Sequence, residues 1–160
     1  MNQKLWRNLA SFACVLCMIV CSKLASGESG GHFYAETLFD FGKVTLRPED
    51  KAKLNQLIAT LKGLRPQVIL VVGHVDRFEG RSAAEKLKLS EMRAQAIKDY
   101  LVANGLDASH IYTEGKSDNF PTESYGKKIT VGCKGSAMTK ELIDCLQPDR
   151  RAEIEGVANP

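Results

Sequence analysis

Alternating and continuous apolar stretches predict four strands along this chain of 160 residues. Residues 36–41 alternate between apolar and polar types, whereas residues 68–72, VILVV, form an unbroken apolar run that suits a strand buried on both faces. A third short strand is predicted at residues 111–114 and a last, alternating one at residues 150–156. Residues 115–128 are rich in turn-forming types and are expected to form a loop.

Helical spacing of apolar residues predicts a helix after the first strand and a short one before the last strand. The first helix begins near Pro48, which suits a first helical turn, and ends near Gly63. Residues 138–146 form the short helix. The inward face of the first helix is predicted to consist of Leu54, Leu57, Ile58 and Leu61.

Another helix is predicted after the central strand, and it stops at Gly105. It starts either at Ser82, which forms a capping box with Glu85, or later at Ser90. Its apolar stripe is predicted to consist of Leu89, Met92, Ala96, Ile97, Tyr100 and Leu101.

This order of elements, β-α-β-α-β-α-β, predicts an α/β fold with a single mixed sheet and helices packed against it. The two strand-helix-strand crossovers predict parallel neighbouring strands with right-handed connections. One domain is expected at residues 34–156, preceded by a linker at residues 28–33 and followed by a tail at residues 157–160.

Residues 1–27 have the layout of a secretory signal peptide. Basic residues precede an apolar run at residues 9–21, and small residues follow it. Cleavage after Gly27 or after Ser22 fits this layout, and a lipid anchor on Cys21 or an uncleaved leader are further alternatives. The protein is therefore expected to be exported.

The predicted leader changes how charge and cysteine content are interpreted. It contains three of the 22 basic residues and none of the 19 acidic ones, so the formal charge of +3 gives no support for nucleic-acid binding. It also contains three of the five cysteines and leaves Cys133 and Cys145. Two cysteines in an exported protein predict a disulfide. A zinc site is the alternative, but the histidines are scattered singly, so no metal is expected. These are His32, His74 and His110.

One acid and one base stand out. Asp76 follows the central apolar strand, at the kind of position where α/β sheets bind ligands. Arg93 falls in the early turns of the next predicted helix, on or beside its inward stripe, where a cation opposes the helix dipole and needs a counter-ion. The two side chains either pair with each other or with solvent, or form the two halves of a binding site.

Five segments of the sequence form a specific combination: LFDFGKVTLRPEDKAKLNQL, VVGHVDRFEG, LKLSEMRAQAIKDYLVANGL, HIYTEGKSDNFP and LIDCLQPDRRAEIE. In this order they resemble the OmpA-like C-terminal domain, a periplasmic fold that binds the stem peptides of peptidoglycan and also occurs in the peptidoglycan-associated lipoprotein. The resemblance extends from Tyr34 to Glu155. It also implies the disulfide between Cys133 and Cys145 that is found in one branch of the family.

The resemblance implies a ligand site for diaminopimelate, whose free end carries an ammonium and a carboxylate. Asp76 matches the family aspartate that holds the ammonium, and Arg93 matches the arginine that grips the carboxylate with two hydrogen bonds. Arg151, in the motif Asp-Arg-Arg, is placed near the same pocket. Val75 stands beside the acid, and His74 is expected to be structural.

Three departures from the family pattern surround this site. Val75 replaces the usual threonine, and Glu85-Lys86 replace a tyrosine-asparagine pair. Asp76 and Arg93 are 17 positions apart, two more than usual, so a longer loop is expected between them. Such an insertion costs little in closure entropy.

The expected function is non-catalytic binding of peptidoglycan through diaminopimelate, which tethers an envelope component to the wall. The resemblance places the protein in the periplasm, associated with the outer membrane or the cell wall, with outer-membrane or envelope proteins as further partners and no cofactor. One alternative is an envelope scaffold with a degenerate ligand site. A wall-cleaving enzyme is another, but the sequence shows no cluster of catalytic groups that supports it.

Overall fold

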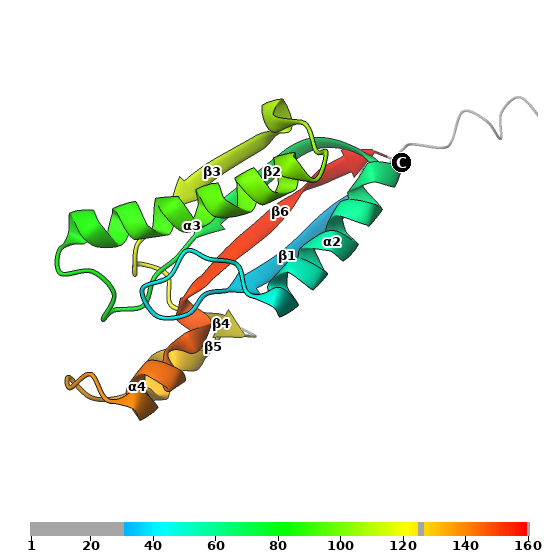
Figure 1. Cartoon of the computed structure of the whole chain (residues 1–160). Coiled ribbons are helices and arrows are strands. Elements are labelled where there is room, and N and C mark those ends of the chain that lie inside the picture. Colours follow the sequence, from blue (N-terminus) through cyan, green and yellow to red (C-terminus); the bar gives the residue numbers. More distant parts are fainter. Residues whose placement is uncertain (1–30, 125–126, 160) are drawn as a thin grey trace, which may run out of the picture.

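The computed structural model describes residues 31–124 and 127–159, in which four strands form one mixed sheet with the order β1-β6-β2-β3 (Figure 1). β6 runs antiparallel to both β1 and β2, and β3 runs parallel to β2. This confirms the predicted fold class. The strands are β1 (Gly31–Leu38), β2 (Arg65–Gly73), β3 (Ile111–Gly115) and β6 (Arg151–Asn159).

Two details of the predicted topology are wrong. β1 and β2 are not neighbours, because the last strand of the chain inserts between them. The segment expected to be a loop contains two short strands, β4 (Glu123–Ser124) and β5 (Lys127–Lys128), which form a separate antiparallel pair. The insertion of β6 has no local signal, because it depends on segments that are distant in the sequence. β4 and β5 are close together in the sequence, but strands of two residues are too short to show an apolar alternation.

The sheet also extends beyond both ends of the predicted domain, and β1 ends at Leu38 although its predicted strand reaches Phe41. Gly31–Phe33, expected to be linker, belong to β1, and Val157–Asn159, expected to be tail, belong to β6, with Gly31 opposite Ala158 and His32 opposite Val157. The pairing supplies backbone hydrogen bonds that neither segment could make alone. The predicted signal peptide, its cleavage sites and Cys21 lie outside the described residues.

Two long helices, α2 (Pro48–Gly63) and α3 (Ala83–Ala103), cover one face of the sheet (Figure 1). The predicted bounds of α2 are confirmed, and α3 takes the earlier of its two candidate starts, because the hydroxyl of Ser82 accepts a hydrogen bond from the amide of Glu85 at 3.2 Å. Shorter helices complete the fold: η1 (Ala108–His110), η2 (Ile129–Gly132), α4 (Lys140–Cys145) and η3 (Gln147–Asp149).

The opposite face of the sheet has no helix over it among the described elements. Val68 on β2 is 45% exposed and Tyr112 on β3 is 57% exposed. The prediction that VILVV is buried on both faces is therefore wrong. The alternate residues Ile69 and Val71 are fully buried under α2 and α3, so the strand has one covered face and one open face.

Helix α3 packs closely on the sheet at two glycines. A Cβ at Gly73 would lie 2.0 Å from the carbonyl oxygen of Ser90, and one at Gly115 would lie 2.5 Å from the Ser90 hydroxyl. The small Ser90 side chain therefore faces the sheet, and Arg93 follows on the same buried face. The predicted stripe is wrong in this half of the helix, where Met92 is 46% exposed.

Candidate ligand site

Asp76 lies in the loop after β2 with its carboxylate fully buried. One carboxylate oxygen accepts hydrogen bonds from the amides of Phe78 at 2.7 Å and Glu79 at 3.1 Å, which closes a tight turn. The other oxygen accepts a hydrogen bond from Arg150 Nη1 at 2.7 Å. The acid that ends the strand is therefore held by the turn on one side and by a buried arginine on the other.

Arg93 projects from the middle of α3 and is also fully buried. Its Nη1 and Nη2 donate to the two carboxylate oxygens of Glu79 at 2.7 and 2.5 Å, a bidentate ion pair. Nη1 also donates to the carbonyl of His74 and Nε to that of Lys43, and the guanidinium lies 5.0 Å from the ring centroid of Phe39. The expected position in the early turns of the helix is wrong, so the helix dipole does not explain its need for a counter-ion.

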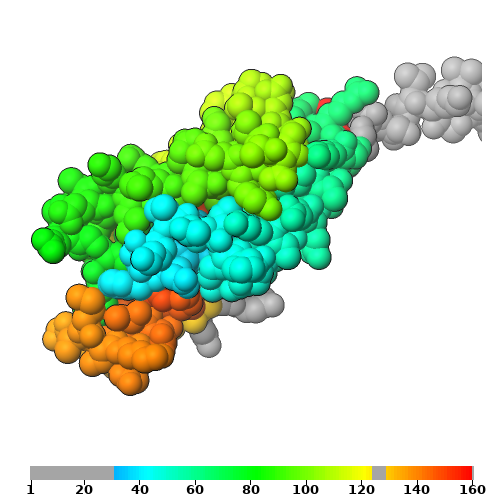
Figure 2. All heavy atoms as spheres, viewed as in Figure 1, coloured from blue at the N-terminus to red at the C-terminus, as the bar shows by residue number. Residues whose placement is uncertain are grey.

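Glu79 connects the two predicted site residues, which do not pair directly. Its Oε2, bonded to Arg93, also accepts a hydrogen bond from the amide of Asp76 at 3.1 Å, and its Oε1 accepts one from the amide of Gly42 at 2.7 Å. Glu79 lies in the loop between β2 and α3, for which the sequence predicts an insertion, and its side chain is buried. Figure 2 shows the chain after β1 (cyan) packed between α3 (green) and the segment around α4 (orange).

The sequence prediction missed Glu79 and Arg150. Glu79 is three positions after Asp76 and Arg150 directly precedes Arg151, and their partners lie 14 and 74 positions away in the chain. The signal for Glu79 was the lengthened loop, which introduces an acid close to a buried cation. Arg150 lies between η3 and β6, and the signal for it was the motif Asp-Arg-Arg, in which it stands directly before Arg151.

The side chains of Arg151 and His74 line a cleft on the open face of the sheet, and Arg93 is not among the residues that line this cleft. Arg151 binds Glu153, with Nη2 at 2.6 Å, and its Nη1 donates to the hydroxyl of Thr122. Within the described residues, neither ring nitrogen of His74 has a hydrogen-bond partner, and burial lowers the pKa of His74 to about 3, with the cations of Arg151 and Lys116 adding to the shift. Val75 is buried and offers no hydroxyl beside Asp76.

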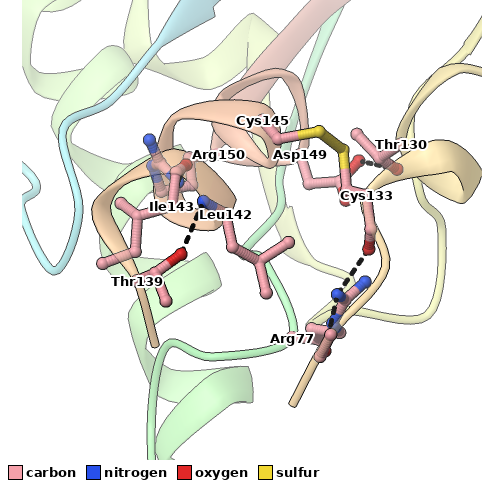
Figure 3. Close-up of a disulfide and its surroundings, with 10 residues drawn as sticks. Arg77, Thr130, Cys133, Thr139, Leu142, Ile143, Cys145, Asp149 and Arg150 are labelled. Carbon is pink, nitrogen blue, oxygen red and sulfur yellow. Dashed lines mark hydrogen bonds between the residues drawn. A yellow bond between two sulfur atoms is a disulfide. The ribbon is translucent and has the colours of Figure 1, made fainter. Parts of the chain in front are cut away.

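The predicted disulfide between Cys133 and Cys145 is present, so these cysteines do not form the alternative zinc site (Figure 3). Arg77 Nη2 donates to the carbonyl of Cys133 at 2.6 Å, and Arg150 Nη1 donates to that of Ile143 at 2.8 Å. The disulfide-linked segment therefore holds both the residue after Asp76 and the partner of its carboxylate.

Two findings concern the described ranges as a whole. No group of three or more histidine, cysteine, aspartate or glutamate side chains in them is arranged to hold a metal ion. None of the helices in these ranges combines the length and apolar character that a membrane span requires.

A mixed sheet covered on one face by two helices, with buried ion pairs beside the end of its central strand, defines a small α/β domain. This chain belongs to the OmpA family, whose model matches residues 38–132, more than half of its length. It is 38% identical over 123 residues to outer membrane protein A of Shimwellia blattae and 39% identical to that of Escherichia coli O157:H7, matches that cover 76% of this chain. The aligned parts are 48% and 33% of those proteins, so the chain matches half of their length or less.

Solved structures show the same fold at low sequence identity. The OmpA-like domain of FopA1 from Francisella tularensis aligns with a TM-score of 0.59 at 23% identity, over 84% of this chain and 79% of that one. The peptidoglycan-associated lipoprotein from Burkholderia pseudomallei aligns with a TM-score of 0.53 at 17% identity, over 78% and 89%. The cell wall anchor of the T6SS from Pseudomonas aeruginosa aligns with a TM-score of 0.57 at 23% identity, over 89% and 96%.

Proposed function

We propose that this protein binds peptidoglycan without cleaving it, through the diaminopimelate of the stem peptides, and tethers an envelope component to the cell wall. The observation that carries the proposal is the geometry at Arg93, which binds the carboxylate of Glu79 with two hydrogen bonds. The backbone amide of Asp76 donates to the same carboxylate. Relatives named outer membrane protein A and a structural neighbour named a cell wall anchor support an envelope role in the periplasm.

The ligand chemistry fits both side chains. The free end of diaminopimelate presents a carboxylate to Arg93 and an ammonium to Asp76. The Asp76 carboxylate accepts three hydrogen bonds, and a carboxylate has about four lone-pair sites, so it can accept one more from the ammonium. Two such ion pairs give micromolar to millimolar affinity for one stem peptide.

Retention on purified sacculi tests this proposal. Asp76→Asn and Arg93→Gln remove one charge each, and Asp76→Asn also keeps the shape of the side chain. Each variant is expected to lose at least about tenfold in affinity, because a charge-assisted hydrogen bond contributes about 1.5–3 kcal/mol. Asp144→Asn, in the exposed pair with Lys140, is the matched control and should be retained like the wild type. Circular dichroism would establish that all variants fold; folded Asp76 and Arg93 variants with wild-type retention would contradict the assignment.

An envelope scaffold with a degenerate site is the second candidate, and the internal pairing of both charges favours it. Titration calorimetry separates the two functions by comparing a diaminopimelate stem peptide with a lysine stem peptide, which lacks the second carboxylate. The binding function predicts clearly tighter binding of the diaminopimelate peptide. Absence of heat with both peptides, together with no retention on sacculi, would leave the scaffold.

A further inference from the structure

The carboxylate of Glu79 occupies a complete anion seat inside this domain. Four donors point at its two oxygens: both terminal nitrogens of Arg93 and the backbone amides of Asp76 and Gly42, at 2.5 to 3.1 Å. The Glu79 side chain is 1% exposed, so these four donors replace the water molecules that would otherwise hydrate its carboxylate. A carboxylate bound from outside would need the same donors.

We propose that Glu79 is a resident occupant of this seat, and that a stem peptide binds by displacing the Glu79 carboxylate with its own. The proposal rests on the proposed function and goes beyond it by assigning Glu79 as the residue that determines which ligands the site accepts. Arg93 then exchanges one bidentate carboxylate for another, so its buried charge keeps a counter-ion throughout.

The position of Glu79 in the chain suits such an exchange. It lies in the connection between β2 and α3, so it can move out without breaking the sheet or either long helix. Gly80 follows with a φ of +76°, a backbone conformation that supplies a sharp turn next to the glutamate. Asp76 keeps its partner Arg150 when Glu79 leaves, so half of the site stays formed.

A tethered competitor imposes selectivity. Glu79 acts at a local concentration on the order of millimolar, so a ligand with a carboxylate alone is outcompeted. A ligand that also offers an ammonium to Asp76 gains a contact that Glu79 lacks. The apparent affinity of the intact protein for a stem peptide is therefore lower than the intrinsic affinity of the site. The factor is the fraction of molecules in which Glu79 has left its four donors.

Titration calorimetry and thermal melting of the full chain test the exchange, in a buffer without carboxylates. Glu79→Ala and Glu79→Gln are expected to bind a diaminopimelate stem peptide at least about tenfold more tightly than the wild type. Sodium acetate is expected to raise the melting temperature of Glu79→Ala and leave that of the wild type unchanged. Glu91→Ala, an exposed acid on α3, is the matched control and should behave like the wild type.

The outcomes separate this inference from the proposed function. Wild-type retention on sacculi with no gain of affinity in either Glu79 variant would overturn the inference and leave the function. Acetate stabilisation of Glu79→Ala with no retention of any protein on sacculi would overturn the function and support the seat. If Glu79→Ala does not fold, Glu79→Gln carries the comparison of peptide affinities, because its amide keeps the shape and releases the charge.

Discussion

Four charged side chains, those of Asp76, Glu79, Arg93 and Arg150, lie almost completely out of solvent beside the end of β2. Each acid forms an ion pair with one arginine, and buried charges are tolerated when they are paired in this way. Removal of one partner from such a pair costs about 3–5 kcal/mol, because the other charge stays buried without a counter-ion. For this reason the folding of each proposed variant has to be established before its affinity is compared with that of the wild type.

The buried side chain of His74 predicts how the stability of the protein depends on pH. Its pKa is lowered from 6.5 to about 3 in the folded protein, so below pH 6.5 the unfolded chain takes up a proton that the folded protein does not. The contribution is complete above pH 6.5 and is lost as the pH falls toward 3, by about 1.4 kcal/mol of unfolding free energy per pH unit. Urea unfolding at pH 7, 6 and 5 measures this slope.

The comparison protein for that measurement is His74→Asn. Other groups titrate in both proteins, among them Glu36, whose pKa is raised by burial, so the difference between the two slopes isolates His74. The wild type should show the steeper loss of stability toward acid. Equal slopes in the two proteins would mean that His74 binds its proton equally well in the folded and the unfolded state, which would contradict the prediction.

Among the elements, the disulfide-linked segment around α4 is the support for the Asp76 loop. It provides a carbonyl acceptor for Arg77, the residue after Asp76, and another for Arg150, which binds the Asp76 carboxylate. The bond joins cysteines separated by 12 positions, a short loop that restrains the unfolded chain. Oxidation of this pair therefore stabilises an element whose packing positions the acid of the candidate site.

Replacement of Cys133 and Cys145 by serine is expected to lower the unfolding free energy by about 3 kcal/mol, as the closed loop predicts. Hydrogen exchange should also become faster at the amides of Phe78 and Glu79, because the supports of their turn are loosened. Urea unfolding and exchange of the wild type with and without reductant provide the measurement. The serine variant is the control, since it should not respond to reductant, and an unchanged wild-type midpoint on reduction would contradict the prediction.

For the molecule as a whole, the proposed function depends on many weak contacts with one polymer. A single stem peptide is expected to bind at micromolar to millimolar affinity, but the wall repeats the peptide, so a dissociated domain rebinds nearby. Retention on intact sacculi should therefore be much stronger than binding to muropeptides released from the same sacculi. Co-sedimentation before and after enzymatic fragmentation measures this ratio, and equal apparent affinities would show that rebinding plays no part.

The sequence by itself determined the two long helices, the four strands of the main sheet in outline and the fold class. Local patterns predicted the bounds of α2 and the apolar run of β2, and they gave Ser82 as one of two candidate caps of α3, because helix caps and apolar periodicity depend on neighbours within a few residues. The cysteine pair and the two residues Asp76 and Arg93 were also identified from the chain.

The tertiary structure alone decided where β6 inserts, which face of the sheet is covered and how the charges pair. Arg93 binds Glu79 rather than Asp76, and Asp76 binds Arg150, because loop, helix and strand meet at one end of the sheet. Burial and pairing of a charge depend on segments distant in the sequence, and one added acid in a loop changes both. The sequence thus predicted an acid and a base for a ligand, and the structure shows a carboxylate of the protein itself bound to that base.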